Sequence, residues 1–149
     1  MNAKLNGGIQ HGQKAWVVFS GQTDIAWLRI LKPGFRHCFV LMNDGQCWIS
    51  YDPMSHYTDI TVHHVPCFFD MPGWLEGRGY RVLETRLNKT HKRPAPIGVF
   101  SCVEAVKRVL GIHHMRIITP WQLFTYLNKH NNTHSAKKEI FHGKSYIAA

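Results

Sequence analysis

A strong hairpin signal near the middle of the chain most constrains its fold. Asp44-Gly45 separates two β-rich runs, GFRHCFVLM and QCWISYD, and Asp-Gly is a preferred sequence for a two-residue hairpin turn. Alternation along the two strands predicts one face with His37, Phe39, Leu41, Trp48, Ser50 and Asp52, and an opposite face with Cys38, Val40, Met42, Cys47, Ile49 and Tyr51. Both faces are largely apolar, which is typical of central strands in a sheet that is covered on both sides.

The same turn predicts which residues face each other across the hairpin. With Asp44 and Gly45 as the two loop residues, His37 faces Asp52. Cross-strand neighbours lie about 5 Å apart at Cβ, so the Asp52 carboxylate can accept a hydrogen bond from the His37 ring. That bond would fix the imidazole tautomer. A histidine on a half-apolar strand is also often a hydrogen-bonded core residue. Cys38 and Cys47 lie on the opposite face, and we expect both to be core thiols.

Further segments complete an α+β pattern. Strand composition or alternation occurs at residues 15–20, 57–65 and 79–87. With the hairpin, these segments predict an antiparallel sheet of about five strands. A short helix is expected over 23–32, with Ile25, Leu28 and Ile30 facing the core, and another helix begins at Thr119. The apolar stripe of the second helix consists of Leu123, Phe124 and Leu127.

A cysteine begins the best-delimited helix, in the stretch 96–112. Ser101 and Glu104 have the S-x-x-E spacing of a capping box, and Gly111 is placed to end the helix. Its apolar stripe consists of Val103, Val106, Val109 and Leu110. Cys102 at the first helical position would meet free backbone N–H groups and the positive end of the helix dipole, which both favour the thiolate. Because free cysteines are usually packing residues, this interpretation needs a partner such as His37.

The residues of the helix and the hairpin resemble a known family. FSCVEAVKRVLG, the strand start GFRHCFV and the polar residue on the linked strand are similar to the papain-like thiol hydrolase fold in its circularly permuted, NlpC-like form. In that form the histidine strand precedes the cysteine helix. The resemblance covers roughly residues 15–127. It implies a papain-like α+β domain and hydrolysis or transfer at an amide, ester or thioester carbonyl through an acyl-enzyme, without a cofactor.

The resemblance also implies a role for each site residue. Cys102 would be the nucleophile, His37 the general base and then acid, and Asp52 the orienting residue of a Cys-His-Asp triad. The oxyanion would lie against the backbone N–H of Cys102, with Gln22 as the candidate second donor. An Asn-Cys-Glu-His motif does not occur at the cysteine, which disfavours the lipid acyltransferases of this group. The expected partner is a peptide, a peptidoglycan-type or an acyl substrate, and the oligomeric state is left open.

Length and charge frame these predictions. A chain of 149 residues with 44% hydrophobic content fits one domain, here 15–127, between a flexible N-terminus (1–14) and a basic, flexible tail (128–149). The net charge is +9, with ten Lys and Arg against two Asp and Glu in 88–149. An alternative is therefore a non-catalytic phage structural or nucleic-acid-binding module that uses this basic part, and weak nucleic-acid contact through the tail is compatible with either alternative.

The sequence predicts neither a metal site nor a membrane span. Eleven histidines and four cysteines offer many metal ligands, but neither C-x-x-C nor H-E-x-x-H spacing occurs, so we expect no metal. Neither a signal peptide nor an apolar run of about 20 residues is present, which predicts no membrane span and a cytoplasmic protein where it is synthesised. GFRHCF, DPMSHYTD and TPWQL are similar to segments of small proteins encoded by tailed phages and prophages. A phage origin would add the virion and the host cytoplasm as locations.

Overall fold

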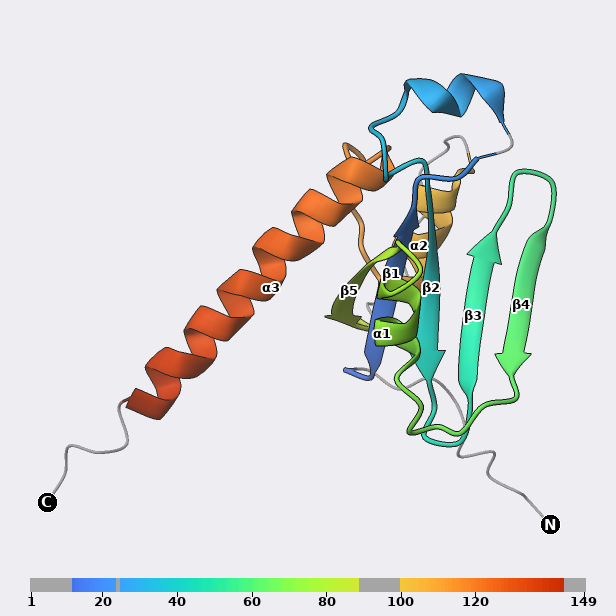
Figure 1. The fold of residues 1–149 in the computed structure, drawn as a ribbon. Helices are drawn as coiled ribbons and strands as arrows, with labels where there is room; N and C mark the ends of the chain where they lie inside the picture. Colours follow the sequence, from blue (N-terminus) through green and yellow to red (C-terminus); the bar gives the residue numbers. More distant parts are fainter. Residues whose placement is uncertain (1–11, 24, 89–99, 144–149) are drawn as a thin grey trace, which may run out of the picture.

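Residues 12–23, 25–88 and 100–143, which a computed structural model describes, fold as one five-stranded antiparallel sheet with helices on both faces (Figure 1). The strands are β1 (Lys14–Ser20), β2 (His37–Asn43), β3 (Trp48–Pro53), β4 (Thr58–His63) and β5 (Arg81–Arg86). The helices are the 3-10 helix η1 (Ala26–Ile30) and the α-helices α1 (Met71–Glu76), α2 (Cys102–Leu110) and α3 (Pro120–Gly143). The strand order is β4-β3-β2-β1-β5. The predicted α+β class and the five-stranded antiparallel sheet are confirmed.

A four-residue turn, from Asp44 to Cys47, joins β2 to β3. The Asp44 carboxylate closes it by accepting hydrogen bonds from the backbone N–H groups of Gln46 and Cys47, each 2.8 Å long. Gly45 supplies the left-handed backbone that the turn requires, with φ of 92°. The predicted two-residue turn is therefore wrong, and Cys47 lies half-buried in the turn instead of in the core.

The longer turn moves the strand register by two residues. Asn43 pairs with Trp48, and the same register continued along the strands puts Phe39, not His37, opposite Asp52. Side chains repeat every two residues along a strand, so this shift changes the neighbours but keeps each strand residue on its predicted face. His37 and Asp52 consequently stay on one face, as diagonal neighbours.

Each face of the sheet has its own apolar core. On one face, Cys38 and Val40 of β2 belong to a buried cluster that includes Val103 and Val106 of α2. On the other face, Leu41 and Trp48 pack in a cluster that includes Met71 and Leu75 of α1. The apolar character of both hairpin faces follows from this arrangement.

The connection from β1 to β2 differs from the prediction. The helix there is a single 3-10 segment, η1, none of whose residues is buried, and Ile30 is 85% exposed. A 3-10 helix has three residues per turn, so Ile25 and Leu28, three positions apart, share one side and are half-buried, whereas Ile30 lies on another side and is exposed. Phe35, which is 3% exposed, makes the core contact of this connection instead.

The start of α3 confirms the predicted helix. The Thr119 hydroxyl accepts a hydrogen bond from the backbone N–H of Gln122 (3.3 Å), and the Gln122 side chain accepts one from the N–H of Thr119 (3.1 Å). Leu123 and Leu127 are buried. Among the described helices, none is both long and apolar enough to cross a membrane.

Helix and strand extend beyond residues 15–127, the range predicted for the domain. Residues 128–143 continue α3 as a helix, where a flexible tail was expected. Neither Gly nor Pro interrupts this stretch before Gly143, so nothing in its sequence breaks the helix. Lys14, expected in a flexible N-terminus, already belongs to β1. Residues 1–11 and 144–149 lie outside the described part of the chain.

Candidate active site

The three residues of the predicted triad lie at one end of the sheet, which we call the thiol end. It is the end at which Ser20 closes β1, His37 opens β2 and Pro53 closes β3. Asp52 is one residue before the end of β3, and Cys102 is the first residue of α2, whose N-terminus lies at this same end (Figure 1). Antiparallel pairing brings the strand ends together, and the packing of α2 on the sheet brings the thiol to them.

His37 and Asp52 form a short, partly buried pair. His37 Nε2 lies 2.6 Å from Asp52 Oδ1, and the two side chains are 19% and 21% exposed. The diagonal relation between the two residues is thus close enough for a direct hydrogen bond. The contact predicted from the hairpin is present, although the register from which it was predicted is wrong.

Cys102 is positioned by a helix with defined ends. The Ser101 hydroxyl accepts a hydrogen bond from the backbone N–H of Glu104 (3.3 Å), which caps the N-terminus as predicted. In a capping box the Glu104 side chain would bond the N–H of Ser101, but its carboxylate pairs instead with Lys107 and Arg108. Gly111 ends the helix in the left-handed conformation, at a place where a Cβ would meet the carbonyl of the chain segment after β5.

Lys107 anchors α2, a role that its sequence did not reveal. Its side chain is buried, with its ammonium donating to the carbonyls of His114 (3.0 Å) and Ile117 (3.1 Å) and pairing with Glu104 at 2.7 Å. A buried lysine with these partners ties the helix to the segment that leads into α3. The sequence alone places Lys107 in the last turn of the helix, and the distant carbonyls that it binds are not visible in the local pattern.

The charges of Cys102 and His37 stabilise each other. The Cys38 thiol has the largest effect on the pKa of the Cys102 thiol and lowers it, whereas burial raises this pKa. With the further contact to His37, the pKa of Cys102 falls to about 5. Burial alone would lower the pKa of His37, but the hydrogen bonds with Asp52 and Cys102 raise it to about 9. With these pKa values, Cys102 is a thiolate and His37 an imidazolium at pH values between about 5 and about 9.

Cys38 has a part in the site that alternation did not predict. It is fully buried in the α2-side core, as expected, yet its thiol and its backbone N–H both lie near enough to Cys102 to lower the pKa of the Cys102 thiol. Burial raises the pKa of the Cys38 thiol well above its usual range, so that it stays protonated and can donate. At a strand end the sheet no longer separates its two faces, which explains how Cys38 and His37 both reach the start of α2.

Gln22 lies near the site without a direct contact that defines its role. It follows β1 at the thiol end, and its side chain is exposed. Its backbone N–H donates to the Ser20 hydroxyl (3.0 Å). Because that N–H is engaged, the role predicted for Gln22 would fall to its side-chain amide.

The described side chains do not assemble a metal centre. Nowhere among them do three or more His, Cys, Asp or Glu residues come together as metal ligands. The Cys102, His37 and Asp52 groups are engaged with one another, and the chemistry available to them is that of a paired thiolate.

Comparison with known proteins adds no relative. No family model, no curated protein and no solved structure matches the chain.

Proposed function

We propose that the protein is a thiol hydrolase or acyltransferase of the papain-like, circularly permuted NlpC-like type, with Cys102 as its nucleophile. The observation that carries this proposal is the position of His37, whose ring hydrogen-bonds Asp52 and lies close enough to Cys102 for their charges to stabilise each other. A base that lies beside its nucleophile and is oriented by a third group is the arrangement that nucleophilic catalysis requires.

The reaction begins with attack of the Cys102 thiolate on the carbonyl carbon of an amide, ester or thioester. The carbonyl oxygen becomes an oxyanion beside the backbone N–H of Cys102, with the Gln22 side chain as the second donor. As the tetrahedral intermediate collapses, the His37 imidazolium donates its proton to the leaving amine, alcohol or thiol. A thioester now joins the acyl group to Cys102.

The second half of the reaction regenerates the enzyme. Neutral His37 takes a proton from water, and the hydroxide formed attacks the thioester carbonyl, releasing a carboxylic acid and the thiolate. An amine or alcohol in place of water gives acyl transfer by the same steps. Asp52 holds the imidazole in position throughout and stabilises its positive charge. The substrate classes that suit this chemistry are peptides, peptidoglycan-type amides and acyl esters.

Alkylation at acidic pH tests the nucleophile without knowledge of the substrate. At pH 6 the Cys102 thiolate is formed, whereas an ordinary thiol with a pKa of about 8.5 is almost wholly protonated. We expect iodoacetamide to label Cys102 first, ahead of Cys47 and Cys67, as located by mass spectrometry of tryptic peptides. First labelling of Cys47 or Cys67 would contradict the assignment.

An acylating ester tests the reaction. With p-nitrophenyl acetate we expect an acetyl group on Cys102 that forms and then disappears as the ester is consumed, and no such species in Cys102→Ala. The non-catalytic alternative predicts nucleic-acid binding that falls steeply with salt and is unchanged in Cys102→Ala. Binding of that kind, without acylation of Cys102, would replace the enzyme proposal with the alternative.

A further inference from the structure

The connection between β1 and β2 exposes more apolar surface than its fold requires. In η1, Trp27 is 66% exposed and Ile30 is 85% exposed, and no residue of this helix is buried. Figure 1 shows η1 projecting beyond the ends of the strands, as the helix farthest out at the thiol end. Large apolar side chains on a projecting segment contribute nothing to the core, so their exposure indicates contact with another apolar phase.

Other exposed apolar side chains lie at the same end. Met54 and Tyr57, in the turn between β3 and β4, are 40% and 53% exposed. Phe100, two residues before α2, is 57% exposed. The strand and helix ends that carry these residues lie at the thiol end, so η1 is one of several segments that expose apolar side chains there.

The chain around η1 is basic. Residues 25–36 contain Arg29, Lys32 and Arg36 and no acidic residue. Arg29 and Lys32 are exposed. Exposed apolar side chains interleaved with basic ones are the composition of segments that lie in the interface of an anionic bilayer.

The connection is held in a defined conformation. The Arg36 guanidinium donates to the carbonyls of Gly21 and Arg29, each at 3.3 Å, and so ties the two ends of the connection together. Lys32 places its ammonium 3.0 Å from the centroid of the Trp121 ring at the start of α3. Because η1 is fixed at its base and beside α3, Trp27 and Ile30 project as a preformed, convex surface.

We infer that the η1 segment, with Trp27, Arg29 and Ile30, docks the protein on the surface of a bilayer that contains anionic lipid. A convex apolar tip suits a deformable surface that can close around it, and the basic residues are complementary to anionic headgroups. Docking in this way places the thiol end against the membrane. The inference goes beyond the proposed function and does not depend on acyl transfer.

Vesicle sedimentation tests the inference with the full chain. Large vesicles of phosphatidylcholine and of an equal mixture of phosphatidylcholine and phosphatidylglycerol are pelleted with the protein, and the bound fraction gives a partition coefficient. We expect clear binding to the anionic vesicles and much weaker binding to the neutral ones. The double variant Trp27→Ala, Ile30→Ala should bind anionic vesicles at least about tenfold more weakly than the wild type. Arg29→Ala should lose about fivefold, on anionic vesicles alone.

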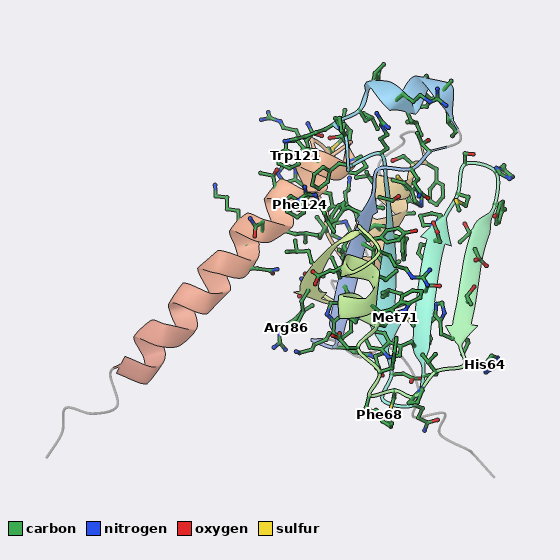
Figure 2. All side chains as sticks on the ribbon, in the orientation of Figure 1. His64, Phe68, Met71, Arg86, Trp121 and Phe124 are labelled. Carbon is green, nitrogen blue, oxygen red and sulfur yellow. The ribbon has the colours of Figure 1, made fainter. Side chains whose placement is uncertain are left out.

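Phe68→Ala is the matched control. Phe68 is 87% exposed, and it lies at the end of the molecule opposite to η1 (Figure 2). We expect unchanged partitioning for this variant, and unchanged melting temperatures for all three, because the altered side chains are not buried. Cys102→Ala should bind like the wild type, so a failure of the thiol chemistry does not affect this measurement.

Three results would overturn the inference. The first is no binding to anionic vesicles. The second is undiminished binding by the double variant, which would assign the affinity to other basic residues such as those of the C-terminal stretch. The third is an equal loss in Phe68→Ala. Retention on an immobilised acidic, apolar peptide together with no vesicle binding would replace the membrane with a protein partner.

Discussion

Two histidines on the same face of the sheet each bond a polar side chain of β3, but only one of them lies beside a nucleophile. His37 Nε2 is 2.6 Å from Asp52 Oδ1 at the thiol end, and His63 Nε2 is 3.0 Å from Ser50 Oγ on the outer strand β4. His63 lies opposite Trp48, which is buried beneath α1. The two pairs are alike in local geometry.

The difference between the pairs comes from what packs beside them. The N-terminus of α2 brings Cys102 to His37, and α2 packs against β2 and β3. His63 lies on β4, at the outer edge of the sheet. A histidine that bonds a polar neighbour is therefore not by itself a sign of a functional site. The His37 pair is a candidate site because the N-terminus of α2 places a thiol beside it. Variants of both pairs test this statement directly.

The largest effect is expected from removing the imidazoles. His37→Ala removes the proton donor and acceptor of both half-reactions, so turnover of an ester that acylates Cys102 should fall about a thousandfold. His63→Ala should change turnover by less than about twofold. The measurement is steady-state release of p-nitrophenol. A comparable loss in both variants would mean that the two pairs do not differ as we propose.

A smaller effect is expected from removing the partners of the histidines. Asp52→Ala should lower turnover tenfold or more, with little change in melting temperature, because the imidazole loses its orienting carboxylate. Asp52→Asn should be milder. Ser50→Ala, on the outer pair, should leave turnover unchanged and cost about 1 kcal/mol of stability through a lost buried hydrogen bond.

Loss of melting temperature in Asp52→Ala with unchanged labelling and turnover at Cys102 would give Asp52 a structural role alone. It would then be a residue that precedes a turn, like many aspartates.

The smallest effect concerns the environment of the thiolate and appears in its pH dependence. The imidazolium and the Cys38 donors favour the thiolate, so the proton leaves at lower pH than from a free thiol, and the alkylation rate should rise with a midpoint near pH 5. Cys38→Ala should raise this midpoint by about one pH unit, and Cys38→Ser, which keeps a donor, by less. Alkylation reactions quenched at set times, across pH 4 to 9, measure this midpoint.

Cys47→Ala is the control for this profile, because Cys47 lies in the turn at the other end of β2 and β3. Its midpoint should match that of the wild type. An unshifted midpoint in Cys38→Ala would remove Cys38 from the site and leave the contacts of His37 as the cause of thiolate formation.

Much of the site could be predicted because it depends on local patterns. The cap at Ser101 and the helical position of Cys102 follow from interactions within a few residues. The shared face of His37 and Asp52 follows from the two-residue repeat, which is the same whether the turn has two or four residues. This explains how a wrong turn length still led to a contact that the structure contains.

Other features could not be read from local patterns. The turn length depended on the Asp44 carboxylate binding two backbone N–H groups, an interaction that competes with the two-residue turn and that the dipeptide alone does not reveal. The exposure of Ile30 depended on the chain forming a 3-10 segment that leaves the sheet, whereas its apolar character suggested a core residue.

The sequence by itself determined the α+β class, the sheet faces and the capped cysteine helix, because each arises from neighbours a few positions apart whose geometry is set by the backbone. The tertiary structure alone decided that α2 begins beside His37, that the Cys38 donors reach Cys102 and that η1 projects from the thiol end. Those contacts join residues tens of positions apart. Their formation depends on how both apolar cores are filled at once, which no single segment encodes.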